Sequence, residues 1–227
     1  MKQPIKDLIK KMPVFGTLAR RAYWALLGGS AAYWEKRYSA GGDSGAGSFG
    51  PLAEFKAQVL NTFVADHRVQ SVIEFGCGDG HQLGLAKYPR YLGFDVSSTA
   101  IAKCRERFGS DTTKSFRLLG DYRRDTADLT LSLDVIYHLV ENETFDRYMR
   151  RLFEASRRYV IIYSSDSDAT PHDEGTHVRH RKFTRWVHEN QKGWTLAQHI
   201  PNRYPYRGDY RTGSFADFYI YEQGGTG

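Results

Sequence analysis

The stretch Val72-Ile73-Glu74-Phe75-Gly76-Cys77-Gly78-Asp79-Gly80 is the strongest indication of fold in this chain. Its apolar residues predict a strand, and its three glycines predict a tight turn in which the backbone can approach a ligand. A helix is expected to follow over residues 81–87. A second apolar run ends at Asp95, placed to accept hydrogen bonds from ribose hydroxyls. The stretch therefore predicts a nucleoside-binding turn.

Apolar runs and amphipathic segments alternate along the chain after residue 50. Apolar, β-branched runs predict strands, and apolar residues spaced three and four apart predict helices. Their alternation predicts a doubly wound α/β fold with a mostly parallel sheet. The expected strands are 69–75, 91–94, 115–119, 128–133, 158–163, 194–200 and 215–221, and the expected helices are 51–66, 81–87, 98–108, 142–156 and 184–189.

Acidic residues follow three of these apolar runs, at Asp95, Asp121 and Asp134. In an open parallel sheet the strand ends share one edge, where ligands bind. A dinucleotide-binding turn would carry a third glycine at position 81, which is His81 in this chain. Together with Glu74 just before the first glycine, this departure makes the chain resemble the class I S-adenosylmethionine-dependent methyltransferases.

The resemblance covers about residues 68–223 and implies a fold, a cofactor and a set of binding residues. The implied fold is a doubly wound, mostly parallel seven-stranded sheet with an antiparallel final strand, which forms a hairpin with the strand before it. A helical N-terminal extension precedes the sheet. The implied cofactor is S-adenosyl-L-methionine. The residues that match the family's cofactor-binding motifs are Glu74, Gly76, Gly78, Asp95, Asp121, Tyr122 and Asp134.

By the same resemblance, each motif contacts one part of the cofactor. The glycine turn, oriented by Glu74, lies near the methionine half, and Asp95 accepts hydrogen bonds from the ribose. Asp121, with Tyr122 beside it, stands where the family contacts the adenine ring. Each acid has an alternative role, because carboxylates also cap helices and stabilise turns.

A glycine-rich loop lies between the N-terminal segment and the expected core. Residues 39–50 contain five glycines and three serines, which is typical of a flexible linker, but the aromatic and charged residues beside them favour a mobile lid. The preceding segment, residues 33–38, resembles a Trp-Glu-x-Arg-Tyr element of several small-molecule methyltransferases. This resemblance implies that Trp34 and Arg37 cover the cofactor, with Arg37 pairing its carboxylate. A purely structural role is the alternative.

The net charge of +6 is concentrated at the N-terminus. Residues 1–27 hold six basic residues and one acidic residue, with apolar residues at helical spacing. Such a basic amphipathic arm can lie on an anionic membrane surface or pack its apolar stripe on the domain. The rest of the chain is nearly balanced in charge, which argues against a nucleic-acid partner. We expect residues 1–50 to form the arm and lid, and residues 51–227 a Rossmann-like methyltransferase domain.

The cysteine count and the apolar runs predict the compartment. Cys77 and Cys104 do not make a disulfide framework, which is typical of a reducing, cytoplasmic setting. No apolar run is long enough to span a bilayer, and the N-terminus lacks a signal-peptide core. We therefore expect a cytoplasmic protein that can associate with a membrane through its arm.

The acceptor side of the expected site carries a candidate base. Asp134 matches motif IV, which in the family lies under the methyl donor and faces the acceptor. His138 follows four residues later, and its imidazole can accept a proton near neutral pH. His177 and His180 are alternative bases, and none of the three histidines belongs to a zinc-binding pattern.

Two long polar connections suggest the kind of acceptor. Residues 164–182 and 201–213 combine cations, aromatic rings and amides, a mixture that suits sugars. We therefore predict O-methylation of a hydroxyl on a sugar, glycoconjugate or other polar small molecule. The alternatives are N-methylation of a small amine or protein side chain, and a non-catalytic nucleoside-binding scaffold.

Overall fold

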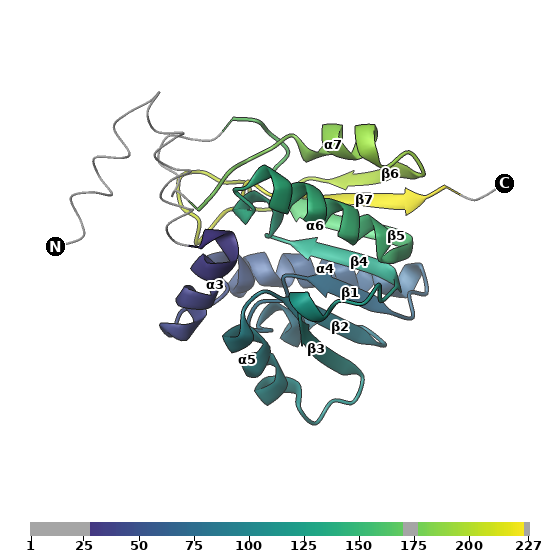
Figure 1. Ribbon diagram of the computed structural model, residues 1–227. Coiled ribbons are helices and arrows are strands. Elements are labelled where there is room, and N and C mark those ends of the chain that lie inside the picture. Colours follow the sequence, from purple (N-terminus) through teal and green to yellow (C-terminus); the bar gives the residue numbers. More distant parts are fainter. Residues whose placement is uncertain (1–27, 170–176, 225–227) are drawn as a thin grey trace.

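The computed structural model describes residues 28–169 and 177–224, so the basic arm of residues 1–27 lies outside the described residues. Within the described part, seven strands form one sheet with helices on both faces (Figure 1). The strands are β1 (Val72–Phe75), β2 (Tyr91–Asp95), β3 (Lys114–Leu118), β4 (Ala127–Leu133), β5 (Ser156–Ser164), β6 (Trp194–Ile200) and β7 (Asp217–Gln223). The α-helices are α3 (Gly29–Ser39), α4 (Gly50–Asp66), α5 (Ser98–Phe108), α6 (Asn142–Glu154) and α7 (Phe183–Asn190).

The strand order in the sheet is β3-β2-β1-β4-β5-β7-β6. Strands β1 to β5 are parallel, β7 runs antiparallel to β5, and β6 pairs antiparallel with β7. This arrangement confirms the predicted doubly wound, mostly parallel sheet with an antiparallel final strand. The strand order changes side between β1 and β4, because β2 and β3 lie on one side of β1 whereas β4 and the later strands lie on the other. Ligands bind at such a switch point in α/β proteins.

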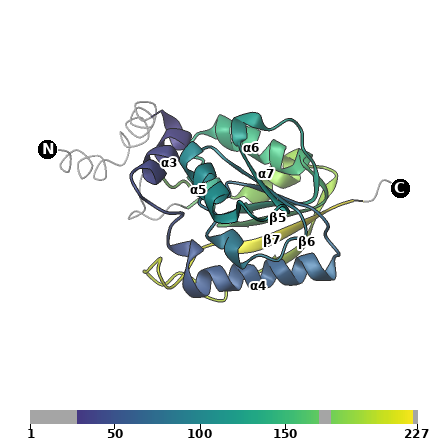
Figure 2. The same ribbon diagram turned by 90° about the horizontal axis from the view of Figure 1, so that it is seen from below.

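The apolar run of β5 is continuous because both faces of the strand are covered. Val160 and Ile162 belong to the core cluster shared with α6 and α7, whereas Ile161 and Tyr163 belong to the cluster shared with α4 and α5. Figure 2 shows α4 along one face of the sheet, with α6 and α7 on the opposite face. Packing on two sides fixes the strand ends that carry the site.

The predicted helix over residues 81–87 is wrong. Only a short 3-10 turn, η2 (Gln82–Leu85), follows the glycine turn. Few residues lie between Gly80 and Pro89, Gly84 disfavours helix, and the residue before a proline is disfavoured in the helical region. The other predicted helices and strands are present, with boundaries shifted by at most three residues.

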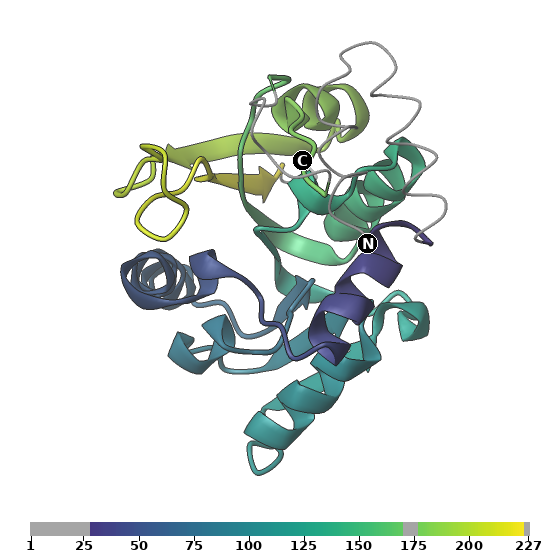
Figure 3. The same ribbon diagram turned by 90° about the vertical axis from the view of Figure 1, so that its left-hand side faces the viewer.

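The helix α5 begins as its sequence predicts. The side chain of Ser97 caps it, because Oγ accepts a hydrogen bond from the Ala100 backbone N–H at 3.0 Å. The first described helix, α3, lies across the edge where the parallel strands end, between α5 and α6 (Figure 3). Among the described residues, no helix has the length and apolar character needed to cross a membrane.

Candidate functional site

The glycine turn after β1 is closely packed on both sides. Gly76 has φ +89°, and a Cβ there would lie 2.5 Å from Cγ2 of Val135. Gly78 has φ +57°, and a Cβ there would lie 2.3 Å from Oγ of Ser44. Both the backbone angle and the lack of space require glycine at these positions. The predicted turn is therefore present, and the loop before α4 packs directly on it.

Asp95, at the end of β2, is held against this turn. Its Oδ2 accepts a hydrogen bond from the Gly78 backbone N–H at 2.9 Å, and its Oδ1 accepts one from Ser97 at 2.9 Å. Burial raises the pKa of Asp95 to about 6, although these amides favour the charged form. The carboxylate thus ties the first two strand ends together at the position predicted to meet a ribose.

Glu74 lies in β1, two residues before Gly76. Its Oε2 accepts a hydrogen bond of 2.6 Å from the Tyr91 hydroxyl. Burial raises the pKa of Glu74 to about 7, and the neighbouring charge of Asp95 acts in the same direction. Two carboxylates with raised pKa values in one place are typical of a functional site.

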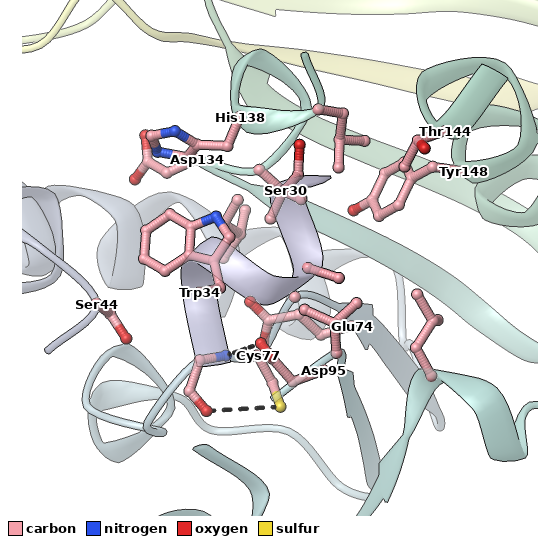
Figure 4. A pocket seen from close by; sticks show the side chains of 18 of the residues that line it. Ser30, Trp34, Ser44, Glu74, Cys77, Asp95, Asp134, His138, Thr144 and Tyr148 are labelled. Carbon is pink, nitrogen blue, oxygen red and sulfur yellow. Dashed lines mark hydrogen bonds between the residues drawn. The ribbon is translucent and has the colours of Figure 1, made fainter. Parts of the chain in front are cut away.

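These groups line a first cavity of about 330 Å³. Figure 4 shows Glu74 and Asp95 on one side of it, Asp134 and His138 on the other, and Trp34 between them. Carboxylates suit hydroxyl and ammonium groups, and the apolar wall suits a heterocyclic base, so the lining fits a nucleoside with an amino-acid tail. The predicted residues that line the first cavity are Trp34, Glu74, Gly76, Gly78, Asp95, Asp134 and His138, and apolar members of the wall are Val96, Leu119, Leu133 and Val135.

Three predicted cofactor residues lie elsewhere. Asp121 is exposed at the end of the 3-10 turn η3 (Leu119–Asp121). The ring of Tyr122 packs edge-on against the ring of Phe75, 5.6 Å away. Arg37 pairs with Asp43 at 3.0 Å rather than lining the first cavity. These three side chains are therefore not among those that line the first cavity, and Arg37 lines a second, neighbouring cavity.

Lys56 is a site residue that was not predicted. It lies on α4, its side chain is 1% exposed, and its Nζ is 2.6 Å from Oδ2 of Asp134. The other oxygen, Oδ1, accepts a hydrogen bond of 2.8 Å from the Tyr137 hydroxyl. Asp134 has φ +59°, a conformation that non-glycine residues rarely adopt. Strain of this kind is common in binding and catalytic sites.

The glycine-rich loop closes over the turn through Ser44. Its Oγ donates a hydrogen bond to Oδ1 of Asp79 at 2.8 Å, and its backbone N–H donates to Oδ2 at 3.2 Å. The Tyr38 hydroxyl lies 3.1 Å from the same Oγ. The predicted lid segment therefore contacts the predicted nucleoside turn.

A second cavity of about 260 Å³ adjoins the first. The two share Trp34, Ser44, Asp134 and His138. Segments far apart in the sequence build the second cavity, because it draws on α3, the glycine-rich loop and both polar connections. Its aromatic and imidazole members are Trp34, Tyr137, His138, His177, Tyr210 and Phe215.

His138, the predicted base, lies at the boundary of the two cavities. Its Nδ1 is 3.2 Å from the backbone oxygen of His177, and its ring stacks on the His177 ring at 5.4 Å. Burial, followed by the charge of His177, lowers the pKa of His138 to about 3. The imidazole is therefore neutral at neutral pH, and Nε2 carries its lone pair when Nδ1 donates to the carbonyl.

The first polar connection is held by its own cations. The guanidinium groups of Arg179 and Arg181 both donate to the backbone oxygen of Val140, at 3.0 and 2.9 Å. His180, one of the alternative bases, is buried and pairs its Nδ1 with the Ser165 hydroxyl at 2.5 Å. These side chains fix the loop against the segment that carries His138.

Comparisons with known proteins agree with this geometry. A family model described as a methyltransferase domain matches residues 73–160. The N-methyltransferase NodS from Bradyrhizobium japonicum WM9, in complex with S-adenosyl-L-homocysteine, has a similar fold, with a TM-score of 0.67 and 17% identity over 86% of this chain and 98% of NodS. A search of curated proteins found no match.

Two further structures share the fold. The magnesium protoporphyrin IX methyltransferase ChlM from Synechocystis PCC 6803, with bound S-adenosylmethionine, matches with a TM-score of 0.56 and 13% identity, over 90% of this chain and 96% of ChlM. The methyltransferase domain of bacterial CtHen1-C matches with a TM-score of 0.59 and 19% identity, over 76% of this chain and 98% of that domain.

The sheet topology and the glycine turn at the switch point define the class I methyltransferase fold. The match over residues 73–160 shows that this fold carries a methyltransferase domain. The chain thus carries a methyltransferase domain, in a fold that it shares with methyltransferases whose structures hold S-adenosylhomocysteine or S-adenosylmethionine.

Proposed function

We propose that the protein methylates a hydroxyl group of a sugar, glycoconjugate or other polar small molecule. The arrangement of the two cavities carries this proposal, because they share Trp34, Asp134 and His138. A cofactor in the first cavity and an acceptor in the second would meet at these residues. The rings of Tyr137 and Tyr210 offer stacking faces for a sugar, and Ser214 offers a polar contact.

We propose that the cofactor is S-adenosyl-L-methionine and that it binds in the first cavity. We propose that Asp95 accepts hydrogen bonds from the ribose hydroxyls and that Glu74 faces the methionine half, with Trp34 as a cover. Bound there, the cofactor supplies a methyl group on a positively charged sulfur. Because this leaving group needs little activation, the protein mainly has to align the acceptor. The roles predicted for Arg37, Asp121 and Tyr122 remain predictions.

His138 is proposed to accept the acceptor's proton. A hydroxyl oxygen becomes strongly acidic as it gains the methyl group, so a weak base is sufficient if the proton moves late. Nε2 of a neutral imidazole can take that proton, while Nδ1 stays directed at the His177 carbonyl. The lowered pKa of His138 therefore keeps it in the form required above about pH 4.

Methyl transfer to defined probes tests the proposal. The assay would measure radioactive methyl transfer from S-adenosylmethionine to methyl α-D-glucopyranoside and methyl α-D-glucuronide, with the 2-amino sugar glucosamine as the amine counterpart. We expect transfer to a hydroxyl probe and a fall of about 100-fold in H138A. Calorimetry with S-adenosylhomocysteine, and with NAD as control, establishes that the variants still bind the cofactor. Binding of S-adenosylhomocysteine without transfer to either hydroxyl probe would argue against the proposal.

N-methylation is the second candidate, and one observation favours it. The pKa of His138 is lowered to about 3, and a neutral amine carries its own lone pair and needs no base to attack. NodS, which has a similar fold, is an N-methyltransferase. Transfer to glucosamine alone, with the methyl group located on nitrogen by fragmentation in a mass spectrometer and turnover of H138A within about threefold of wild type, would select this candidate.

A contact with anionic membranes is proposed for residues 1–27. The support is the sequence, in which six basic residues accompany an apolar pattern of helical spacing. Deleting residues 1–27 should abolish sedimentation with phosphatidylglycerol vesicles while leaving S-adenosylhomocysteine affinity unchanged. Equal sedimentation of the full and shortened chains would eliminate this contact.

A further inference from the structure

The ion pair between Lys56 and Asp134 costs desolvation free energy, which a purely structural contact would not need. Lys56 lies on the apolar stripe of α4, in line with Leu52 and Leu60, and its side chain is 1% exposed. Besides contacting Asp134, its Nζ lies over the ring of Tyr163, 5.2 Å from the ring centroid. Replacing a buried ion pair by apolar residues often leaves stability equal or higher. The position of the pair therefore points to a role in the site.

The pair spans the two cavities. Lys56 lines the first, Tyr137 lines the second, and Asp134 lines both. The two oxygens of Asp134 are fixed by separate donors, Lys56 on Oδ2 and Tyr137 on Oδ1. A Cβ at Gly47 would lie 3.1 Å from Oδ2, so the glycine-rich loop closes directly over the carboxylate. An anion is thus held at the junction, with its countercation on the side of the first cavity.

We propose that Lys56 is a positioning residue that holds Asp134 as an anion at the point where the methyl group is transferred. The carboxylate then lowers the energy of the positive charge that moves from the sulfur to the acceptor and on to the base. In the step itself, the bond between the acceptor oxygen and the methyl carbon forms as the carbon–sulfur bond breaks. The electron pair stays on sulfur, and the hydroxyl proton passes to His138.

Preorganised charges of this kind act without rearrangement during the reaction. Asp134 and His138 lie on the same side of the first cavity (Figure 4), and the charge of Asp134 raises the pKa of that imidazole against the effect of burial. The proposal rests on the assignment of the first cavity to the cofactor and of the second to the acceptor. It does not depend on whether the acceptor atom is oxygen or nitrogen.

A ratio of two affinities tests the proposal without an acceptor. Sinefungin carries an ammonium group at the position of the transferred methyl, whereas S-adenosylhomocysteine is uncharged there. The affinity of sinefungin divided by that of S-adenosylhomocysteine therefore reports the potential at this position. We expect this ratio to fall about tenfold in D134N. An unchanged ratio in D134N would overturn the role of Asp134.

The contribution of Lys56 is read from the pH dependence of the same ratio. Lys56 from α4, Tyr137 and His138 after β4, and Tyr163 from β5 face Asp134, and Glu74 faces Lys56. K56M removes the cation that pairs with this carboxylate, and loss of a nearby opposite charge favours the neutral form of a carboxyl group. The ratio should hold in wild type from pH 8 to pH 5.5 and collapse over this range in K56M. Glu74 titrates in the same range and faces Lys56, so the ratio is compared in the E74Q background, between E74Q and E74Q/K56M. Asp95 is present in both variants, so its titration is common to them.

Three further variants separate positioning from folding. K56M/D134N removes both charges, so it should fold even if K56M does not, and its ratio should stay below that of wild type because the anion is absent. K56R keeps the cation and should keep the wild-type ratio. Y163F is the matched control, because it removes a hydroxyl near the pair without touching Asp134.

A pH-independent ratio in E74Q/K56M, equal to that of E74Q, would overturn the role of Lys56. If K56M does not fold, a ratio in K56R equal to that of D134N would do so. If hydroxyl methylation fails, the methyl-transfer assay with the sugar probes shows it. The affinity ratio is a separate measurement, so it still decides the role of Lys56 and Asp134.

Discussion

The two cavities are built in different ways. The first is built around strand ends whose positions are set by sheet pairing, with α3, α4 and α6 closing it. Its glycine turn is fixed by a backbone hydrogen bond from Gly76 to Phe94 at 2.7 Å. The second draws its walls from α3, the glycine-rich loop and both polar connections, which are held by side-chain contacts such as Arg181 to Val140. A site fixed by the sheet is suited to a constant cofactor, and a site fixed by loops is suited to an acceptor that differs between relatives. Variants in the turn, in the cavity floor and in the loops test this difference.

The largest effect is expected in the turn itself. In G76A, the alanine would adopt a left-handed conformation and its Cβ would press against Val135. Strain and overpacking together cost about 2–5 kcal/mol. We expect loss of stability and at least a 30-fold loss of S-adenosylhomocysteine affinity by calorimetry. G84A is the matched control, because a Cβ at Gly84 meets nothing within 4 Å. Equal affinities of G76A and wild type would show that the turn is not part of the cofactor site.

The sequence predicted the first cavity better than the second. Strand ends follow from apolar periodicity, and glycines report the backbone angles of a turn, so Gly76, Gly78 and Asp95 could be placed from the residue pattern alone. The walls of the second cavity depend on how distant loops pack. No local pattern shows, for example, that Arg179 and Arg181 donate to the carbonyl of Val140.

Lys56 is an instructive omission, because the sequence does carry a signal for it. In the helix over residues 51–66, Lys56 lies four residues after Leu52 and four before Leu60, on the apolar face. A lysine on such a stripe needs a buried anion. The periodicity could have identified the need for a partner, but only the fold shows that the partner is Asp134.

The next largest effect concerns Glu74, whose burial in the first cavity lowers the stability of the protein at high pH. Folding raises the pKa of Glu74 from 4.5 to about 7, so the folded protein binds this proton more tightly than the unfolded chain does. The proton held by Glu74 therefore contributes most to the free energy of unfolding below pH 4.5, and this contribution is lost as the pH rises toward 7. E74Q keeps an acceptor for Tyr91 and removes the charge. It should match wild type at pH 4.5 and exceed its free energy of unfolding by about 3 kcal/mol at pH 8.

Urea unfolding at both pH values measures this difference. E54Q is the control, because Glu54 is exposed on α4 and its replacement should change stability by less than about 0.5 kcal/mol at either pH. We also expect E74Q to bind S-adenosylmethionine more weakly, because the substitution that raises stability also removes a negative charge from the proposed cofactor site. A lower stability of E74Q at pH 8 would contradict the expectation.

A smaller effect is expected where the two kinds of architecture meet. S44A removes the hydroxyl that joins the glycine-rich loop to Asp79 and leaves the backbone contact of residue 44 in place. The same hydroxyl accepts a hydrogen bond from the Asp79 backbone N–H at 3.1 Å and lies 3.1 Å from the Tyr38 hydroxyl. Because each hydrogen bond is worth about 1 kcal/mol, S-adenosylhomocysteine affinity should fall by at least about fivefold. S39A is the matched control, because within the described part of the chain the Ser39 hydroxyl donates a hydrogen bond to Lys36 of the same helix, α3. Equal affinities of S44A and S39A would show that the loop contact does not contribute to binding.

The smallest effect is expected at Arg37. The family resemblance assigns it to the cofactor's carboxylate, but its guanidinium donates to Asp43 instead, through Nε to the backbone oxygen at 2.7 Å and through a second nitrogen to the carboxylate at 3.0 Å. Both side chains are substantially exposed, and such pairs contribute about 0.2–1 kcal/mol. R37A should therefore change S-adenosylhomocysteine affinity by less than about threefold. D43A removes the carboxylate contact and leaves only the backbone contact of residue 43, so it decides between the two assignments. Tighter binding in D43A, together with a loss of at least about tenfold in R37A, would mean that Arg37 leaves Asp43 for the cofactor. The loop side of the molecule would then take part in binding the donor.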